Sequence, residues 1–267
     1  MPTTLTSKQS DRRSASRRVR RQRHLDISLP QPDRSLSQDE EWCDVRIGDQ
    51  WRRIRFHDYE NLYAVPGLYE AVIYDILRCS SPATVCSMLA EAIGAAGERA
   101  GGLRVLDLGA GNGIVGAELV ERGVDHVVGV DIIPEAARAA QRDRPDVYKD
   151  YLVADLSRLE AEDRRAMRLH RFNALTCVAA LGFGDIPKEV FVEAYGLVQT
   201  GGWIAFNIKE DFLCDGDDSG FAGLIRSMIR SGAMDVRSEK RYVHRLGTDQ
   251  SPIHYMAIIG RKRRDIE

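Results

Sequence analysis

The sequence has few cysteines, and they are not arranged in pairs. It contains five, an odd number without any Cys-x-x-Cys spacing: Cys43, Cys79, Cys86, Cys177 and Cys214. This pattern excludes a disulfide framework and a structural zinc site, and it is typical of a protein of the reducing cytoplasm. Four scattered histidines, His24, His57, His126 and His170, also lack metal-ligand spacing, so we expect no metal ion.

Long hydrophobic runs and a large excess of one charge are missing as well. No run of about 18 apolar residues is present, so we expect no transmembrane helix and no membrane partner. The pairs Arg12-Arg13 and Arg17-Arg18 are not followed by an apolar stretch, which argues against a twin-arginine export signal. The formal net charge is only −2. This balance disfavours a nucleic-acid partner for the molecule as a whole.

Composition divides the chain into three parts. Residues 1–40 are polar, with a cluster of arginines between positions 12 and 23. They predict a disordered basic tail, with a polyanion-binding arm as the alternative. Residues 41–100 are expected to form a helical cap or lid, because Leu68, Val72 and Ile76 recur at helical spacing and Pro82 can begin a second helix. Residues 101–267 form the third part.

In this third part short apolar runs alternate with helical stretches. The runs predict five buried strands, at 104–108, 126–130, 151–154, 174–179 and 203–208. Helices are expected at 115–122, 134–142, 187–198 and 220–231. Two closing strands, at 235–244 and 253–260, have no helix between them and predict an antiparallel hairpin. The expected fold class is α/β, a Rossmann-like domain whose seven-stranded, mostly parallel sheet carries helices on both faces.

A glycine-rich turn follows the first strand of this domain: Val105-Leu106-Asp107-Leu108-Gly109-Ala110-Gly111-Asn112-Gly113. Glycines tolerate positive φ and let a ligand approach the backbone, and the next helix offers free N–H groups. The same turn contains Gly111-x-Gly113-x-x-Gly116, the nominal dinucleotide fingerprint. A carboxylate at Asp107 would repel a pyrophosphate but attract the net cationic S-adenosylmethionine, so the charge favours the latter.

Two further strands also end in an aspartate. Asp131 closes the second strand, where a carboxylate can accept hydrogen bonds from both ribose hydroxyls of a nucleoside. Asp155 closes the third strand and could bond an adenine amino group. Each alone could be a helix N-cap. Three parallel strands that all end in aspartate at one sheet edge favour a nucleoside-containing cofactor.

The segment from Leu103 to about Lys209 resembles the class I S-adenosylmethionine-dependent methyltransferase superfamily. The matching features are its first motif, its ribose-binding acid, its adenine-side motif and the turn before its fifth strand: Asp107-x-Gly109-x-Gly111-x-Gly113, Asp131, Asp155-Leu156 and Gly201-Gly202-Trp203. The closing hairpin also resembles the reversed strand pair of that fold. One departure is Phe172-Asn173, where many members carry Phe-Asp at a position that is usually structural.

The resemblance implies S-adenosylmethionine as the cofactor. The residues expected to contact it are Asp107, Gly109, Ala110, Gly111, Asn112, Gly113, Asp131, Ile132, Asp155, Leu156 and Val178. The loop after the fourth strand, residues 178–187, lacks the Asn/Asp-Pro-Pro-Tyr/Phe sequence of many enzymes that methylate amino groups of DNA and proteins. Its small apolar residues resemble small-molecule methyltransferases instead.

Candidates for the remaining site come from the cap and from the ends of the later strands. Expected substrate contacts are Tyr63, Tyr74, Phe183, Asn207 and Arg245. The two tyrosines could instead form an aromatic core face, whereas Arg245 could pair with an acidic substrate group. His244, His254 and Glu210 are the candidates for a catalytic base. Hydrogen bonding within the hairpin, for the histidines, and a solvated loop, for Glu210, are the alternatives.

We therefore predict a cytoplasmic methyltransferase that transfers a methyl group in line to an oxygen or nitrogen of a small molecule. Positioning and desolvation can supply much of the rate, because the sulfonium is already a strong electrophile. The alternatives are a protein or peptide methyltransferase served by the basic tail, a non-catalytic cofactor-binding protein, and an oxidoreductase that uses a dinucleotide.

Overall fold

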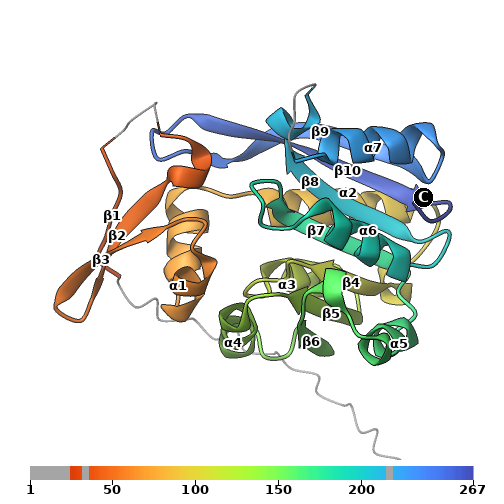
Figure 1. Cartoon of the computed structure of the whole chain (residues 1–267), viewed down its shortest axis with the longest axis horizontal. Coiled ribbons are helices and arrows are strands. Elements are labelled where there is room, and N and C mark those ends of the chain that lie inside the picture. Colours follow the sequence, from red (N-terminus) through yellow and green to blue (C-terminus); the bar gives the residue numbers. More distant parts are fainter. Residues whose placement is uncertain (1–24, 32–35, 215–218, 267) are drawn as a thin grey trace, which may run out of the picture.

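The protein is described here by a computed structural model, which covers residues 25–31, 36–214 and 219–266 (Figure 1). The arginine cluster of the predicted basic tail lies outside the described residues. Within the described parts of the chain, no helix combines the length and the apolar character that a membrane span requires.

A seven-stranded sheet forms the centre of the molecule, with strand order β6-β5-β4-β7-β8-β10-β9. Its strands are β4 (Arg104–Leu108), β5 (His126–Asp131), β6 (Asp150–Val153), β7 (Ala174–Leu181), β8 (Trp203–Lys209), β9 (Met234–Leu246) and β10 (Pro252–Lys262). The first five are parallel, and β10 runs antiparallel to both β8 and β9. The predicted α/β fold with its antiparallel hairpin is confirmed.

Helices pack on both faces of this sheet: α2 (Ser81–Ala95), α3 (Ile114–Glu121), α4 (Pro134–Asp143), α5 (Ala161–Leu169), α6 (Lys188–Leu197) and α7 (Phe221–Arg230). Successive strand residues point to opposite faces. Leu106 therefore joins the core formed with α5, α6 and α7, while Val105 joins the core formed with α2 and α3. Helix α5 was not predicted, because its Glu- and Arg-rich sequence buries only Met167.

The N-terminal segment differs from the helical prediction. Residues 42–55 form a hairpin of two strands, β2 (Trp42–Ile47) and β3 (Gln50–Arg55), and β1 (Ile27–Ser28) pairs with β2. A strand therefore lies inside the segment that was expected to be disordered. The missed signal is the alternation that buries Cys43 and Val45, followed by a Gly48-Asp49 turn.

Helices follow further along the segment: α1 (Tyr59–Ala64), the π-helix η2 (Glu70–Ile76) and α2. Helix α2 packs on the sheet, so residues 41–80 alone form the structure that we call the cap. The cap has its own core and lies at one end of the sheet, where α1 contacts α4 (Figure 1). It is joined to β9 by two backbone hydrogen bonds, from Ser80 to His244 and from Leu246 to Leu77.

Lys262 is a buried cation that holds the end of a helix. It is 2% exposed, and its Nζ donates to the carbonyls of Tyr195 and Val198 at 2.8 and 2.7 Å. These carbonyls close α6, where backbone acceptors lack partners and the helix dipole favours a positive charge.

We expect Lys262→Met to lower the free energy of unfolding by about 2–3 kcal/mol, because it removes a charged donor from both buried carbonyls, and the Tyr195 carbonyl then keeps only the Val198 backbone N–H. Urea denaturation checks this. Lys240→Met is the matched control on the exposed part of β9, where a change below about 0.5 kcal/mol is expected. Equal losses for the two variants would contradict the assignment.

Candidate active site

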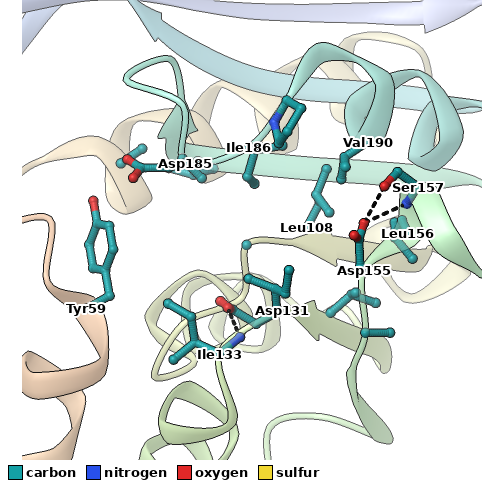
Figure 2. Close-up of a pocket in the computed structure, with 18 of the residues that line it drawn as sticks. Tyr59, Leu108, Asp131, Ile133, Asp155, Leu156, Ser157, Asp185, Ile186 and Val190 are labelled. Carbon is teal, nitrogen blue, oxygen red and sulfur yellow. Dashed lines mark hydrogen bonds between the residues drawn. The ribbon is translucent and has the colours of Figure 1, made fainter.

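A cavity of about 300 Å³ opens at the carboxyl ends of β4, β5, β6 and β7. This is the edge at which ligands bind in open α/β sheets. Figure 2 shows Asp131 and Asp155 reaching into it from the sheet side, with Asp185 and Ile186 above and Tyr59 of the cap facing them. Three cap tyrosines, Tyr59, Tyr63 and Tyr69, complete the wall.

The glycine turn requires residues without a side chain. Gly109 lines the cavity with φ +69°, and a Cβ there would lie 2.9 Å from the Ala180 Cβ. At Gly111 (φ +54°) a Cβ would come within 2.5 Å of the Tyr63 hydroxyl. Burial raises the pKa of Tyr63 well above its usual value, so its hydroxyl stays protonated beside this turn.

Asp131 joins the glycine turn to the next loop. Its carboxylate accepts hydrogen bonds from the backbone N–H of Gly111 at 2.9 Å and of Ile133 at 3.0 Å, one on each oxygen. Each carboxylate oxygen has two acceptor positions, so both can accept a further bond from a ligand in the cavity. Burial, the largest influence, raises the pKa of Asp131 above its ordinary value. The two hydroxyls of a ribose would donate hydrogen bonds to these acceptor positions of Asp131, in place of the water that burial excludes.

Asp155 lies at the other end of the same cavity. It caps the turn Leu156–Arg158 by accepting from the Ser157 backbone N–H at 2.9 Å and from the Ser157 hydroxyl at 2.6 Å, which hold the pKa of the carboxyl below its usual range. The space beside it is apolar, between Leu108 and Val190 (Figure 2). Ile132 leaves 60% of its surface exposed here. A flat, apolar ring such as adenine would cover it.

Asp107 does not line the cavity, in contrast to the sequence-based expectation. It is 1% exposed and accepts hydrogen bonds from the hydroxyls of Thr176 at 2.7 Å and Tyr148 at 2.8 Å. Burial outweighs these bonds and raises the pKa of Asp107 to about 7. The Asp107 carboxyl therefore holds neighbouring side chains beneath the glycine turn instead of facing a ligand. It is only partly charged near neutral pH.

The other predicted cofactor residues divide in the same way. Leu156 and Val178 line the cavity together with Gly109, Ile132, Asp131 and Asp155. Residues Ala110, Asn112 and Gly113 lie outside it. Asn112 donates to Glu70 of the cap at 3.2 Å, and Gly113 is the N-cap of α3, with φ +86°. These three residues shape the turn instead of facing a ligand.

Among the predicted substrate residues, only Tyr63 lines this cavity. Asn207 is completely buried; its amide oxygen accepts from the backbone N–H of Ala179 at 2.6 Å, and its amide nitrogen donates to Ser81 and Tyr242. Arg245 is paired with the equally buried Glu41. The prediction that Arg245 pairs with a substrate acid is therefore corrected, because the cap already supplies its carboxylate.

Two other predicted substrate residues lie elsewhere. Phe183 lines a smaller chamber of about 30 Å³ behind the main cavity, and Tyr74 packs in the cap against Tyr69 with ring centroids 5.9 Å apart. The aromatic-core alternative therefore describes Tyr74.

The three predicted base candidates lie outside the main cavity. His244 lines the small chamber, but its Nδ1 lies 2.6 Å from the Ser81 hydroxyl, and burial, followed by the charge of Arg245, lowers its pKa well below the usual value. Glu210 is half-buried, and its carboxylate is paired with Arg241 at 2.9 Å. His254 lies on β10. The hairpin alternative is the better description of His244, and the solvated-loop alternative is the better description of Glu210.

Sequence reasoning missed a pair of residues that do line the cavity. His57 Nδ1 lies 3.0 Å from the Asp185 carboxylate, and the two side chains are 15% and 24% exposed. They are 128 positions apart. In the sequence, His57 was considered only as one of four histidines without metal-ligand spacing. The available signal was a histidine next to Asp58-Tyr59 at the start of a cap helix.

Comparison with known proteins agrees with this geometry. Residues 106–206 match the family described as a methyltransferase domain. The match covers the glycine turn, both strand-end aspartates and the fifth parallel strand. This region is therefore similar to a methyltransferase domain.

Similar individual proteins include two bacterial enzymes named ubiquinone biosynthesis O-methyltransferase. The one from Chromobacterium violaceum is 30% identical over 106 residues, which is 40% of this chain and 44% of the relative. The one from Paraburkholderia phymatum is 31% identical over 108 residues, with the same two shares. The chain thus spans less than half the length of the curated relatives it matches. A solved structure, magnesium protoporphyrin IX methyltransferase from Synechocystis with bound S-adenosylmethionine, shares 15% identity at a TM-score of 0.48, over 68% of this chain and 79% of that one.

The buried carboxyl of Asp107 gives a prediction for stability against pH. Its pKa is about 7 in the folded protein and 3.8 when exposed, so the folded state binds the proton more tightly. The resulting stabilisation is full below about pH 4 and is lost as the pH rises through 7. Asp107→Asn removes this titration. The variant should gain stability relative to the wild type by on the order of 4 kcal/mol between pH 4 and pH 8.

Urea denaturation of the ligand-free protein across this pH range measures the difference. Asp146→Asn, at an exposed position, is the control and should follow the wild type. Parallel curves for wild type and Asp107→Asn would show that the buried carboxyl does not titrate in this range.

Proposed function

We propose that this protein transfers the methyl group of S-adenosylmethionine to a hydroxyl oxygen of a small molecule. The observation that carries the proposal is the position of Asp131 in the lining of the main cavity, where each carboxylate oxygen accepts one backbone hydrogen bond and has a second acceptor position. The names of the bacterial relatives, which are O-methyltransferases, support oxygen over nitrogen as the acceptor.

The residues present fit the cofactor. The ribose would bind Asp131, the adenine would lie between Leu108 and Ile132 with its amino edge towards Asp155, and the methionine part would lie over Gly109. The cap tyrosines would cover the sulfonium, because aromatic faces attract cations. When bound, S-adenosylmethionine supplies an electrophilic methyl group. The chain contributes orientation and the exclusion of water.

We also propose that two parts of the chain have different roles. Residues 41–80 act as a cap that closes the cofactor cavity, and residues 101–267 form the methyltransferase domain. All five cysteines are free thiols, and this supports a role in the cytoplasm, where thiols stay reduced.

Calorimetry with S-adenosylmethionine and S-adenosylhomocysteine tests the cofactor site. Asp131→Asn keeps one carbonyl oxygen but loses the charge, so it should weaken the binding of both ligands at least about 10-fold, since hydrogen bonds to a charged acceptor contribute about 1.5–3 kcal/mol. The exposed Asp146→Asn should bind like the wild type. Binding of NAD or NADP in place of the adenosyl ligands would sink the proposal.

A further inference from the structure

His57 and Asp185 meet at a junction of cavities. His57 lies between β3 and α1 in the cap, and Asp185 lies in the loop after β7. Both line the main cavity and also the small chamber behind it. Figure 2 shows Asp185 and Tyr59 at the end of the cavity opposite Asp155. A cofactor whose adenine lies near Asp155 therefore extends its reactive end towards this pair.

The hydrogen bond between them determines which nitrogen of His57 can act. A carboxylate only accepts hydrogen bonds, so the 3.0 Å contact places the hydrogen on Nδ1. The other ring nitrogen, Nε2, then carries a lone pair. A histidine held in this way by a carboxylate has the form of a general base.

The walls around the pair are suited to a flat acceptor. The ring of His57 makes edge contacts with Phe183 and Tyr59, with ring centroids 5.0 and 5.7 Å apart. Phe56 and Tyr255 line the small chamber beside them. Aromatic walls of this kind favour a planar ring over a flexible chain.

The small chamber also has an unused polar group. Among the described residues, Gln38 Oε1 is the buried side-chain oxygen or nitrogen that has no hydrogen-bond partner, while its Nε2 donates to the Tyr255 hydroxyl at 3.1 Å. A buried acceptor without a donor is costly. A hydroxyl or amino substituent on the acceptor would satisfy it. The chamber, of about 30 Å³, has room for such a substituent but not for a whole ring.

We propose that His57 is the catalytic base for a small phenolic acceptor, that Asp185 is its positioning residue, and that the small chamber receives a polar substituent of the acceptor ring. This proposal rests on the methyl-transfer function proposed above. His57 Nε2 takes the phenol proton while the oxygen lone pair forms the new bond to the methyl carbon. The electron pair of the breaking carbon–sulfur bond stays on sulfur. The products are the methyl ether, neutral S-adenosylhomocysteine and a His57 imidazolium, which is stabilised by Asp185 and later gives its proton to water.

A phenol is also the hydroxyl class whose acidity suits this base. Phenolic hydroxyls have a pKa of about 10, whereas aliphatic alcohols are far weaker acids, so an imidazole removes the proton of a phenol more easily.

The backbone that presents Asp185 is strained. Ala179 and Phe183, which are not glycines, have φ of 56° and 53°, and Gly182 and Gly184 are also left-handed. The loop is closed by a hydrogen bond from the Asp185 N–H to the Gly182 carbonyl at 3.1 Å and by the Gly182–Ile186 bridge. Strain of this kind persists only where the surroundings enforce it, and it gathers at functional sites.

The test compares phenols of different acidity on the full chain. Catechol and caffeate are mostly protonated at neutral pH, whereas 4-nitrocatechol can be ionised in the assay. His57→Ala should lower kcat about 10²–10⁴-fold on catechol and caffeate but by less than about 10-fold on ionised 4-nitrocatechol, which needs no base. Added imidazole should restore part of the catechol activity. Asp185→Asn should lower kcat about 10-fold or more while KM stays within a factor of about two.

His254→Gln is the matched histidine control, outside the cavity, and should leave activity unchanged. Calorimetry with S-adenosylmethionine separates the two proposals, because His57→Ala must still bind the cofactor. Equal losses on all three phenols without imidazole rescue would overturn the base assignment, and so would an undiminished kcat. Cofactor binding by the wild type without methylation of any of the phenols would overturn the acceptor class. Failure of the wild type to bind the cofactor would instead refute the proposed function.

Discussion

The side chain of Asn207 lies on β8 with no exposed surface, and all the groups it bonds belong to other elements. Its oxygen accepts from the N–H of Ala179, at the irregular part of β7 where the strand register shifts. Its nitrogen reaches Ser81, at the start of α2, and Tyr242 of β9. A buried amide has a strict requirement for partners. This one therefore fixes the bend in β7 relative to the sheet and to the end of the cap.

The bend in β7 determines where Asp185 lies in the candidate active site. With β7 irregular beyond Cys177, the chain turns back through Gly182 and presents Asp185 towards the cap instead of continuing the strand. His57 is brought to it from the cap, which is held in place by the buried Arg245–Glu41 pair and by backbone bonds to β9. Loss of any of these contacts would cost free energy, because a buried charge or amide that loses its partner cannot form a hydrogen bond with water instead.

Asp107 and Asp131 show how position in a sheet differs from role. Both stand at the carboxyl end of neighbouring parallel strands. Asp107 points into the protein, where Thr176 and Tyr148 use its oxygens, and its pKa rises to about 7. Asp131 points towards the cavity and is bonded only by backbone N–H groups. The strand-end rule finds both carboxyls, but the alternation of side chains and the final turn of backbone decide which one faces a ligand.

The same distinction explains what could be predicted from sequence. The strands of the sheet follow from apolar runs of the right length, and the ligand-binding edge follows from glycines and aspartates at the strand ends. Gly109, Asp131 and Asp155, which line the cavity, were therefore among the predicted residues. The cap hairpin was missed because Trp42–Ile47 alternates between charged and buried residues. This two-residue period is typical of a strand and does not match the helical spacing on which the prediction was based. His57 and Asp185 were missed for a stronger reason. The local signal at His57 does not point to Asp185, and the contact between the two residues depends on the bend at Ala179 and on the packing of the cap, which are tertiary features. The proposed base is built from two segments far apart in the sequence, so it is complete only where the packing of the cap places His57 beside Asp185.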